Sequence, residues 1–345
     1  MKPIILQGHT RPIKDIKFNK DGDLLFTCSL DKFVTLWASE TGERIGTFEH
    51  AAAVNNMALT SDSKILISGD NLGDSYFWDV ESGKLLKKMS NKDTVYMRSI
   101  DLSYGDEKLI LTYSGRSKKE TRSYLDIYKL SDILSSETNE NQIIKSPSPF
   151  KTISSTKSNF SIGKWINLNK NIVCTRDDGY VELIDYETGN SLIEKPVHKN
   201  IIMDMDISKK EEIILTSGKD GRACVIDPDT LDVIHVLHPQ KPTRNINSCK
   251  ISPLFSIGDE NEEKYHVILA GGQESRDVTT TDVKQGGFEL LIYNAMYGEE
   301  LGAIQGHFGP VNTIAFDPSG KIVASGAEDA TIRVHKLDED YFNLQ

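Results

Sequence analysis

Short stretches in which apolar and polar residues alternate recur along the whole chain, and clusters of turn residues separate them. In the first fifty residues this alternation predicts strands from Ile13 to Phe18, Asp23 to Cys28, Phe33 to Ala38 and Glu43 to Phe48. The turn at 19–22 ends in a glycine, which supplies the positive φ that a short hairpin requires. Four short strands in hairpin order predict one small antiparallel sheet.

A fixed interval of six residues separates a turn aspartate from the end of the strand that follows it. The interval occurs at Asp31 to Trp37, Asp178 to Ile184, Asp220 to Ile226 and Asp329 to His335. Comparable strand ends occur seven times, at Trp37, Trp78, Tyr128, Ile184, Ile226, Tyr293 and His335. Where no insertion intervenes, neighbouring ends lie 41 or 42 residues apart, which is the period of WD repeats.

Seven such units predict an all-β, seven-bladed β-propeller of the WD40 kind. One four-stranded sheet cannot bury both of its faces, whereas sheets stacked around a channel can. The last unit has only three strands, so we expect the N-terminal strand 3–6 to complete it and close the ring. Residues 1–345 then form a single domain. The expected blades are about 8–48, 50–88, 94–153, 160–195, 198–237, 243–304 and 306–337.

Histidines upstream of the turn aspartates predict a repeated structural brace. In blade one, we expect His9, Thr27, Asp31 and Trp37 to form a hydrogen-bonded chain. Further brace residues are Asp178, His198, His307 and Asp329. A His–Asp chain also resembles a catalytic relay, but an active site is needed once, whereas a brace is needed in many blades. Blade two has Leu72 at the aspartate position, so we expect its brace to be broken.

Three polar insertions and the C-terminal tail depart from the repeat. Two insertions, 114–123 and 273–286, are expected between the second and third strands of their blades. The third, 131–149, has the composition of a flexible loop, and its two Ser-Pro pairs are either phosphorylation sites or loop punctuation. Leu337, Tyr341 and Leu344 have helical spacing, which indicates either a turn packed on the propeller or part of a docking surface.

The charge balance narrows the class of partner. The chain carries 51 acidic and 40 basic residues, a formal net charge of -11, so broad electrostatic binding to nucleic acid is not expected. Protein partners with basic or aromatic anchors suit this surface better. No apolar run approaches the roughly 20 residues that cross a bilayer, and the N-terminal apolar stretch is too short for a signal peptide. We expect a cytoplasmic protein without membrane contact.

The sequence offers no motif for catalysis, a cofactor or a metal. The four cysteines are scattered without a CxxC pair, which favours buried apolar roles over a metal site. Gly42 to Gly46 lacks the Lys-Ser/Thr ending of a phosphate-binding loop, and no GxSxG or HExxH occurs. We therefore expect no enzyme and no cofactor.

Three segments resemble one family, subunit I of eukaryotic translation initiation factor 3. The most specific is GGQESRDVTTT at 271–281, which a generic WD protein would not carry. The others are GHFGPVN at 306–312, with SGAED at 325–329, and the opening 1–31 with TGERIGTFEH at 41–50. The likeness is weak through blades two to five.

The resemblance implies a non-catalytic scaffold whose partners are initiation factor 3 subunits B and G, the first of them through a C-terminal helix. The small ribosomal subunit is reached through the complex, and the chain is expected to be a monomer outside it. The partner-binding candidates are Asp204 and Asp220, which lie sixteen residues apart at the two ends of one hairpin in blade five. For each residue the alternative is a purely structural role, and this alternative is stronger for Asp220, because it is the turn aspartate of the repeat. The alternative function is a WD-repeat adaptor for signalling or for substrate recognition by a ubiquitin ligase.

Overall fold

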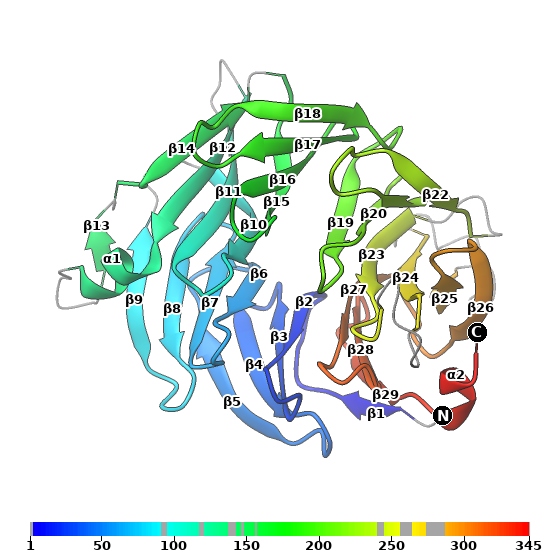
Figure 1. Ribbon diagram of the computed structural model, residues 1–345. Coiled ribbons are helices and arrows are strands. Elements are labelled where there is room, and N and C mark those ends of the chain that lie inside the picture. Colours follow the sequence, from blue (N-terminus) through cyan, green and yellow to red (C-terminus); the bar gives the residue numbers. More distant parts are fainter. Residues whose placement is uncertain are drawn as a thin grey trace.

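Seven β-sheets surround a central axis in the computed structural model (Figure 1). The residues that it describes are 3–344 apart from 91–94, 117–120, 137–142, 146–147, 156, 240–244, 256–263 and 274–286. Within a blade we letter the strands a to d from the axis outward. The prediction of an all-β, seven-bladed propeller is confirmed.

The strands follow the predicted alternation closely in the regular blades. Blade one consists of β2 (Ile13–Phe18), β3 (Leu24–Ser29), β4 (Phe33–Ala38) and β5 (Arg44–Glu49). Strands b and c are buried almost throughout, because neighbouring blades cover both of their faces. Strand d lies at the periphery and is largely exposed.

The other blades repeat this order of strands. Blade two contains β6 (Val54–Leu59), β7 (Ile65–Asp70), β8 (Ser75–Asp79) and β9 (Leu85–Ser90). Blade three contains β10 (Val95–Leu102), β11 (Lys108–Arg116), β12 (Thr121–Lys129) and β14 (Lys151–Ser155). Blade four contains β15 (Phe160–Ile166), β16 (Asn171–Arg176), β17 (Tyr180–Asp185) and β18 (Ser191–Pro196). Blade five contains β19 (Ile202–Ile207), β20 (Ile214–Gly218), β21 (Ala223–Ile226) and β22 (Val233–Leu237). Blade six contains β23 (Asn245–Ile251), β24 (His266–Gly272), β25 (Leu290–Asn294) and β26 (Glu299–Ile304). Blade seven contains β27 (Val311–Phe316), β28 (Ile322–Ala327) and β29 (Ile332–Lys336).

The N-terminal strand closes the ring, as predicted. Strand β1 (Ile4–Leu6) pairs antiparallel with β29, so blade seven gains its outermost strand from the opposite end of the chain (Figure 1). Leu6 is buried in a cluster that joins Trp37 of blade one to Val334 of blade seven. The N-terminal strand therefore belongs to the sheet of blade seven, and the first and last blades share a core cluster.

The innermost strand of each blade carries an irregularity near its start. The register shifts by one residue there, for example between Ile13 and Asp15 in blade one and between Ile202 and Asp204 in blade five. A bulge of this kind redirects the side chains that follow it. It turns Asp15 and Asp204 toward the axis, where they line a common cavity.

The insertion at 131–149 is more ordered than its composition indicated, so the expectation of a flexible loop was wrong for two parts of it. Helix α1 (Leu130–Ser135) buries Leu130 and Ile133 in the core between blades two and three. Strand β13 (Ile143–Lys145) pairs in parallel with β9 and makes blade two five-stranded. One blade's insertion thus covers the outer edge of its neighbour, at the left of Figure 1.

The remaining irregular segments are only partly described. The insertion at 114–123 continues strands β11 and β12, and 117–120 lies outside the described residues. Most of the insertion at 273–286 and one of the two Ser-Pro pairs, Ser146 with Pro147, lie outside them too. The tail forms α2 (Glu339–Phe342), whose Tyr341 is buried against the ring of His266 in blade six.

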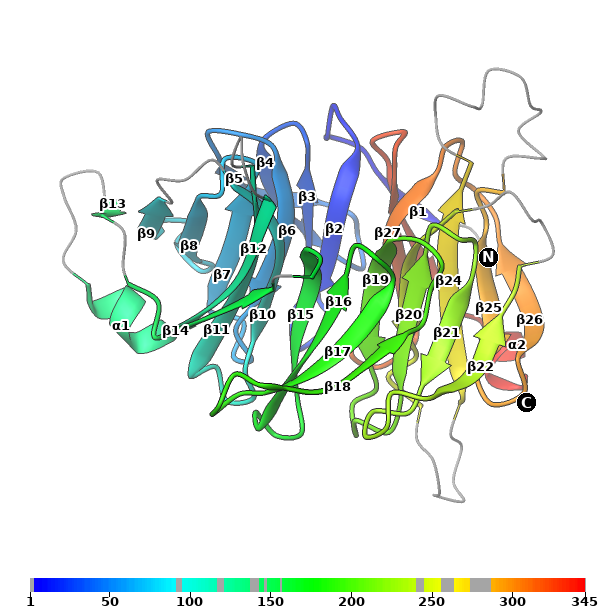
Figure 2. The same ribbon diagram turned by 90° about the horizontal axis from the view of Figure 1, so that it is seen from above.

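Figure 2 shows the ring from a second direction, in which the strands of neighbouring blades run side by side across its thickness. The connections between strands gather on two opposite faces of the ring. These two faces and the outer wall are the surfaces that a partner can reach.

Candidate functional site

The loops that connect strand d to the next strand a, together with the b–c turns, form one face of the ring, which we call the upper rim. In blade one a hydrogen-bonded chain links the two kinds of loop. His9 Nδ1 lies 2.8 Å from Asp31, and His9 Nε2 lies 2.9 Å from Thr27 Oγ1. Trp37 Nε1 donates to the same hydroxyl at 2.9 Å. A carboxylate can only accept, so Nδ1 carries the imidazole proton and Nε2 accepts from Thr27.

Blade five has nearly the same geometry without a tryptophan. His198 Nδ1 lies 2.9 Å from Asp220, and His198 Nε2 lies 2.9 Å from Thr216 Oγ1. Asp220 also accepts from the backbone of Lys199 and from Arg222. Its carboxylate is therefore held in place by several groups of this chain.

Blade seven keeps a looser form of this arrangement. His307 lies 3.5 Å from Asp329 and 2.8 Å from Ser325 Oγ, while His335 stands where blade one has Trp37. Repetition at three places in the ring is what a structural element requires, and each chain ties a d–a loop to a b–c turn.

Blade two departs from expectation. The sequence led us to expect a broken brace, but a variant of it is present. His50 Nε2 lies 2.7 Å from Ser68 Oγ, to which Trp78 Nε1 donates at 3.0 Å. The carbonyl of Phe48 takes the place of the missing aspartate, 3.2 Å from His50 Nδ1. A backbone acceptor can replace a carboxylate here because the histidine needs only one acceptor to fix its tautomer.

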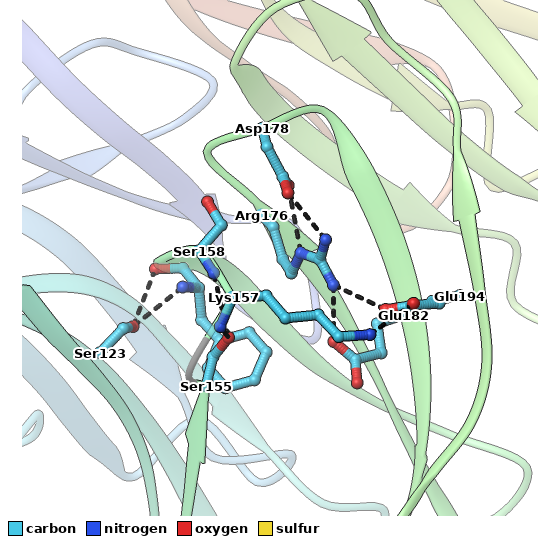
Figure 3. Close-up of polar contacts among 9 residues, drawn as sticks. Ser123, Ser155, Lys157, Ser158, Arg176, Asp178, Glu182 and Glu194 are labelled. Carbon is cyan, nitrogen blue, oxygen red and sulfur yellow. Dashed lines mark hydrogen bonds and ion pairs between the residues drawn. The ribbon is translucent and has the colours of Figure 1, made fainter.

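Blade four replaces the predicted brace with an ion-pair cluster that the sequence pattern did not lead us to expect. Asp178 pairs with Arg176 at 2.7 Å, not with a histidine. Figure 3 shows the guanidinium of Arg176 between Asp178 and the carboxylates of Glu182 and Glu194, and Lys157 reaching Glu194. The signal was available in the sequence, since Arg176 is a charged residue at the end of a buried strand b. Three carboxylates compensate its almost fully buried charge.

The carboxylates of the upper rim are held ionised. Burial raises the pKa of Asp31, Asp220 and Asp329, but hydrogen bonds from the braced histidines and from backbone amides, together with electrostatic attraction, outweigh it and leave each pKa below the usual range. In contrast, burial lowers the pKa of His50 to about 4, so this imidazole is neutral at physiological pH. The braces thus combine ionised acids with fixed imidazole tautomers.

Asp204 lies in a different environment from Asp220. Its carboxylate faces the axial channel and accepts from Lys250 Nζ and Ser248 Oγ at 2.7 Å each, and from the backbone of Cys249 at 3.1 Å. Burial raises the pKa of Asp204, yet the charge of Lys250 and the hydrogen bonds from Lys250 and Ser248 together outweigh it and leave the pKa low. The side chain of Asp204 is 22% exposed, against 8% for Asp220, so Asp204 is the more accessible of the two candidates.

Similar bonds link the innermost strands of other neighbouring blades around the channel. Asp15 accepts from the backbone of Met57 at 3.2 Å, and Asp101 accepts from the backbone of Trp165 at 2.9 Å. The channel encloses a cavity of about 420 Å³, lined by both basic and acidic side chains. Its charges are largely engaged in joining blades, which fits a structural role for the channel.

The described residues contain little that suggests reaction chemistry. Among them, no group of three or more His, Cys, Asp or Glu side chains is placed to hold a metal ion. All four cysteines are free and buried, and burial raises the pKa of Cys224 to about 12. Thiols in such surroundings are poor nucleophiles. No helix in the described part of the chain is long and apolar enough to span a bilayer.

Comparison with known proteins gives one consistent result. The EIF3I family model matches residues 1–345. A curated protein from Schizosaccharomyces pombe, eukaryotic translation initiation factor 3 subunit I, is 35% identical over 348 residues, covering all of this chain and 99% of the relative. Proteins of the same name from Danio rerio and Homo sapiens are each 32% identical over 346 residues, again with 100% and 99% coverage.

Proposed function

The chain belongs to the family of eukaryotic translation initiation factor 3 subunit I, and we propose that it acts within that factor as a non-catalytic scaffold. The observation that carries this proposal is the match over the full length of both this chain and its relatives. A ring of seven similar sheets offers two rims and a peripheral wall to protein partners. The relatives share the name of a translation factor subunit, which supports a role as one component of a larger assembly.

We propose further that the upper rim of blade five receives the C-terminal helix of the factor's B subunit, with its G subunit nearby. This rim is held rigid by His198, Asp220 and Thr216, and Asp204 lies at the start of its inner strand. Both carboxylates are engaged within the chain, so a basic residue of the helix would share them with Lys250 or Arg222. A pre-organised surface loses little entropy when a partner binds, which favours such a rim as a receptor. Contact with the small ribosomal subunit then follows through the assembled factor.

A matched pair of variants tests this contact. Asp220→Asn and Asp31→Asn remove equivalent brace carboxylates from blades five and one, whose histidine distances are 2.9 and 2.8 Å. We expect Asp220→Asn, and also Asp204→Asn, to weaken binding of the C-terminal segment of the B subunit by about tenfold, roughly 1.4 kcal/mol. Asp31→Asn is expected to leave this binding unchanged, as measured by isothermal titration calorimetry. Equal losses in all three variants would show that the effect comes from general destabilisation, and the blade-five contact would be abandoned.

A further inference from the structure

The outer edge of blade five is an unpaired strand. Blade five has the order β19-β20-β21-β22, and no strand among the described residues pairs with the outer side of β22. In Figure 1, β22 lies on the periphery of the ring. The outward N–H and C=O groups of such a strand can pair with another chain.

The composition of β22 distinguishes it from the other peripheral strands. Proteins usually protect exposed edges with charged residues or proline. Strands β5, β14, β18 and β26 each contain at least one charged residue, and β18 also ends in a proline. The five residues of β22, VIHVL, contain neither, and β1, the other uncharged strand, is only three residues long. Blade five therefore has the least protected edge of useful length.

Three side chains of this strand are open to solvent. Val233, Ile234 and Val236 are 39%, 45% and 38% exposed. In the neighbouring blade, Leu192 of β18 is exposed as well, and Lys195 of β18 pairs with Asp232 at the start of β22. An exposed apolar edge of this kind can bind another chain or aggregate unless another segment covers it.

The same molecule covers one comparable edge by adding a strand. Strand β13 pairs in parallel with β9, with Ile143 opposite Lys88 and Lys145 opposite Ser90. The peripheral strands of this propeller are thus able to accept an additional strand in parallel orientation. The equivalent position beside β22 is unfilled by the described residues.

We propose that β22 accepts an extended segment of a partner protein by strand addition. The segment would have about five residues, apolar side chains to cover Val233, Ile234 and Val236, and a lysine or arginine beside Asp232. Asp232 is 67% exposed and has Lys195 as its ion-pair partner, so it retains accessible oxygen for a second cation. A second copy of this chain is a poor occupant, because two molecules of net charge -11 repel each other. This interface is separate from the proposed contact with a helix on the upper rim.

Hydrogen–deuterium exchange tests strand addition directly, because it reports on backbone hydrogen bonds. Exchange is compared between the isolated chain and the tagged chain purified from its own cells in whatever assembly it forms. We expect those amides of Val233–Leu237 that point away from β21 to exchange about tenfold more slowly in the assembly, while those of β5 are unchanged. Equal exchange of β22 in both preparations would overturn the proposal. Slower exchange in an assembly that contains only copies of this chain would overturn the assignment to a partner.

Two matched variants separate strand addition from other modes of docking. Ile234→Lys and Ile45→Lys both change the second residue of a peripheral strand, and these isoleucines are 45% and 55% exposed. We expect Ile234→Lys to reduce recovery of one co-purifying protein by about tenfold and Ile45→Lys to leave it unchanged. Equal recovery with both variants would contradict the proposal. Loss of a partner in Ile234→Lys without slowed exchange in the native assembly would indicate a docked helix instead of a strand. If Ile234→Lys fails to fold, the exchange measurement on the native chain still decides.

The outcome is independent of the identity of the assembly. If β22 is protected by a protein in an assembly without initiation-factor subunits, strand addition stands and the proposed function fails. If those subunits co-purify and β22 exchanges freely, the proposed function stands and strand addition fails.

Discussion

Replacement of Leu6 by alanine tests whether the N-terminal strand fastens the ring. Leu6 is 1% exposed and packs with Ile13, Trp37 and Val334, which belong to the first and last blades. Its neighbour Ile5 is 45% exposed on the same strand, so Ile5→Ala removes a similar side chain without opening the core.

The expected magnitude follows from the burial. Leu→Ala removes about three carbon atoms, which at about 0.8 kcal/mol each amounts to roughly 2.4 kcal/mol of lost transfer free energy. A residual cavity raises this value, and buried Leu→Ala changes cost about 2–5 kcal/mol in total. We therefore expect Leu6→Ala to lower the free energy of unfolding by about 3 kcal/mol, and Ile5→Ala by less than about 1 kcal/mol.

Equilibrium unfolding in urea measures both variants, with the shift in midpoint converted through a common slope. A pronounced difference between the two variants supports closure by β1. If Leu6→Ala is no more destabilising than Ile5→Ala, the strand is not an integral part of the ring, and the argument from its burial is refuted.

Three further predictions concern the turns, the ion-pair cluster and pH. Gly179→Ala should lower the free energy of unfolding by more than about 2 kcal/mol, because φ is +85° there and a Cβ would lie 2.2 Å from the carbonyl oxygen of His198. At Gly46 a Cβ would meet no atom within 4 Å apart from its chain neighbours, so Gly46→Ala should change stability by less than about 1 kcal/mol in the same denaturation assay. Arg176→Met should lower the free energy of unfolding by about 3 kcal/mol, because it leaves Glu182 unpaired. Glu194→Gln, at the exposed side of the cluster, should lower it by less than about 1 kcal/mol. Equal effects of the two variants would mean that the cluster is not buried as described. Burial lowers the pKa of His50, His266 and His335 to about 4, so at these three sites the unfolded chain binds more protons than the folded one between about pH 6.5 and 4. Their contribution should lower the melting temperature as pH falls through that window. Replacing His50 by glutamine should therefore make the profile flatter there, and an unchanged profile would contradict the burial of His50 as a neutral group.

The regular blades could be predicted from the sequence because local pattern and global fold agree in them. Strand β2 has the bounds that its alternation predicts, and Trp37, Ile226 and His335 all lie at or next to the ends of third strands. The period of the repeat indicated the number of blades, and the missing last strand of blade seven pointed to the N-terminus.

What could not be predicted depends on contacts between distant parts of the chain. Nothing in residues 143–145 indicates that they add to β9, since a three-residue strand has no pattern of its own. A backbone carbonyl at Phe48 replaces the aspartate of blade two, and sequence patterns do not record backbone acceptors. The partner of Asp204, Lys250, lies 46 residues away on the next blade, so only the stacking of blades brings the two together.

Affinity purification of the tagged chain followed by mass spectrometry tests whether this propeller is a scaffold of translation initiation factor 3. We expect the factor's B and G subunits to co-purify in amounts comparable to the bait. Recovery of ubiquitin-ligase or kinase components without any initiation-factor subunit would contradict this expectation and favour an adaptor on the same fold.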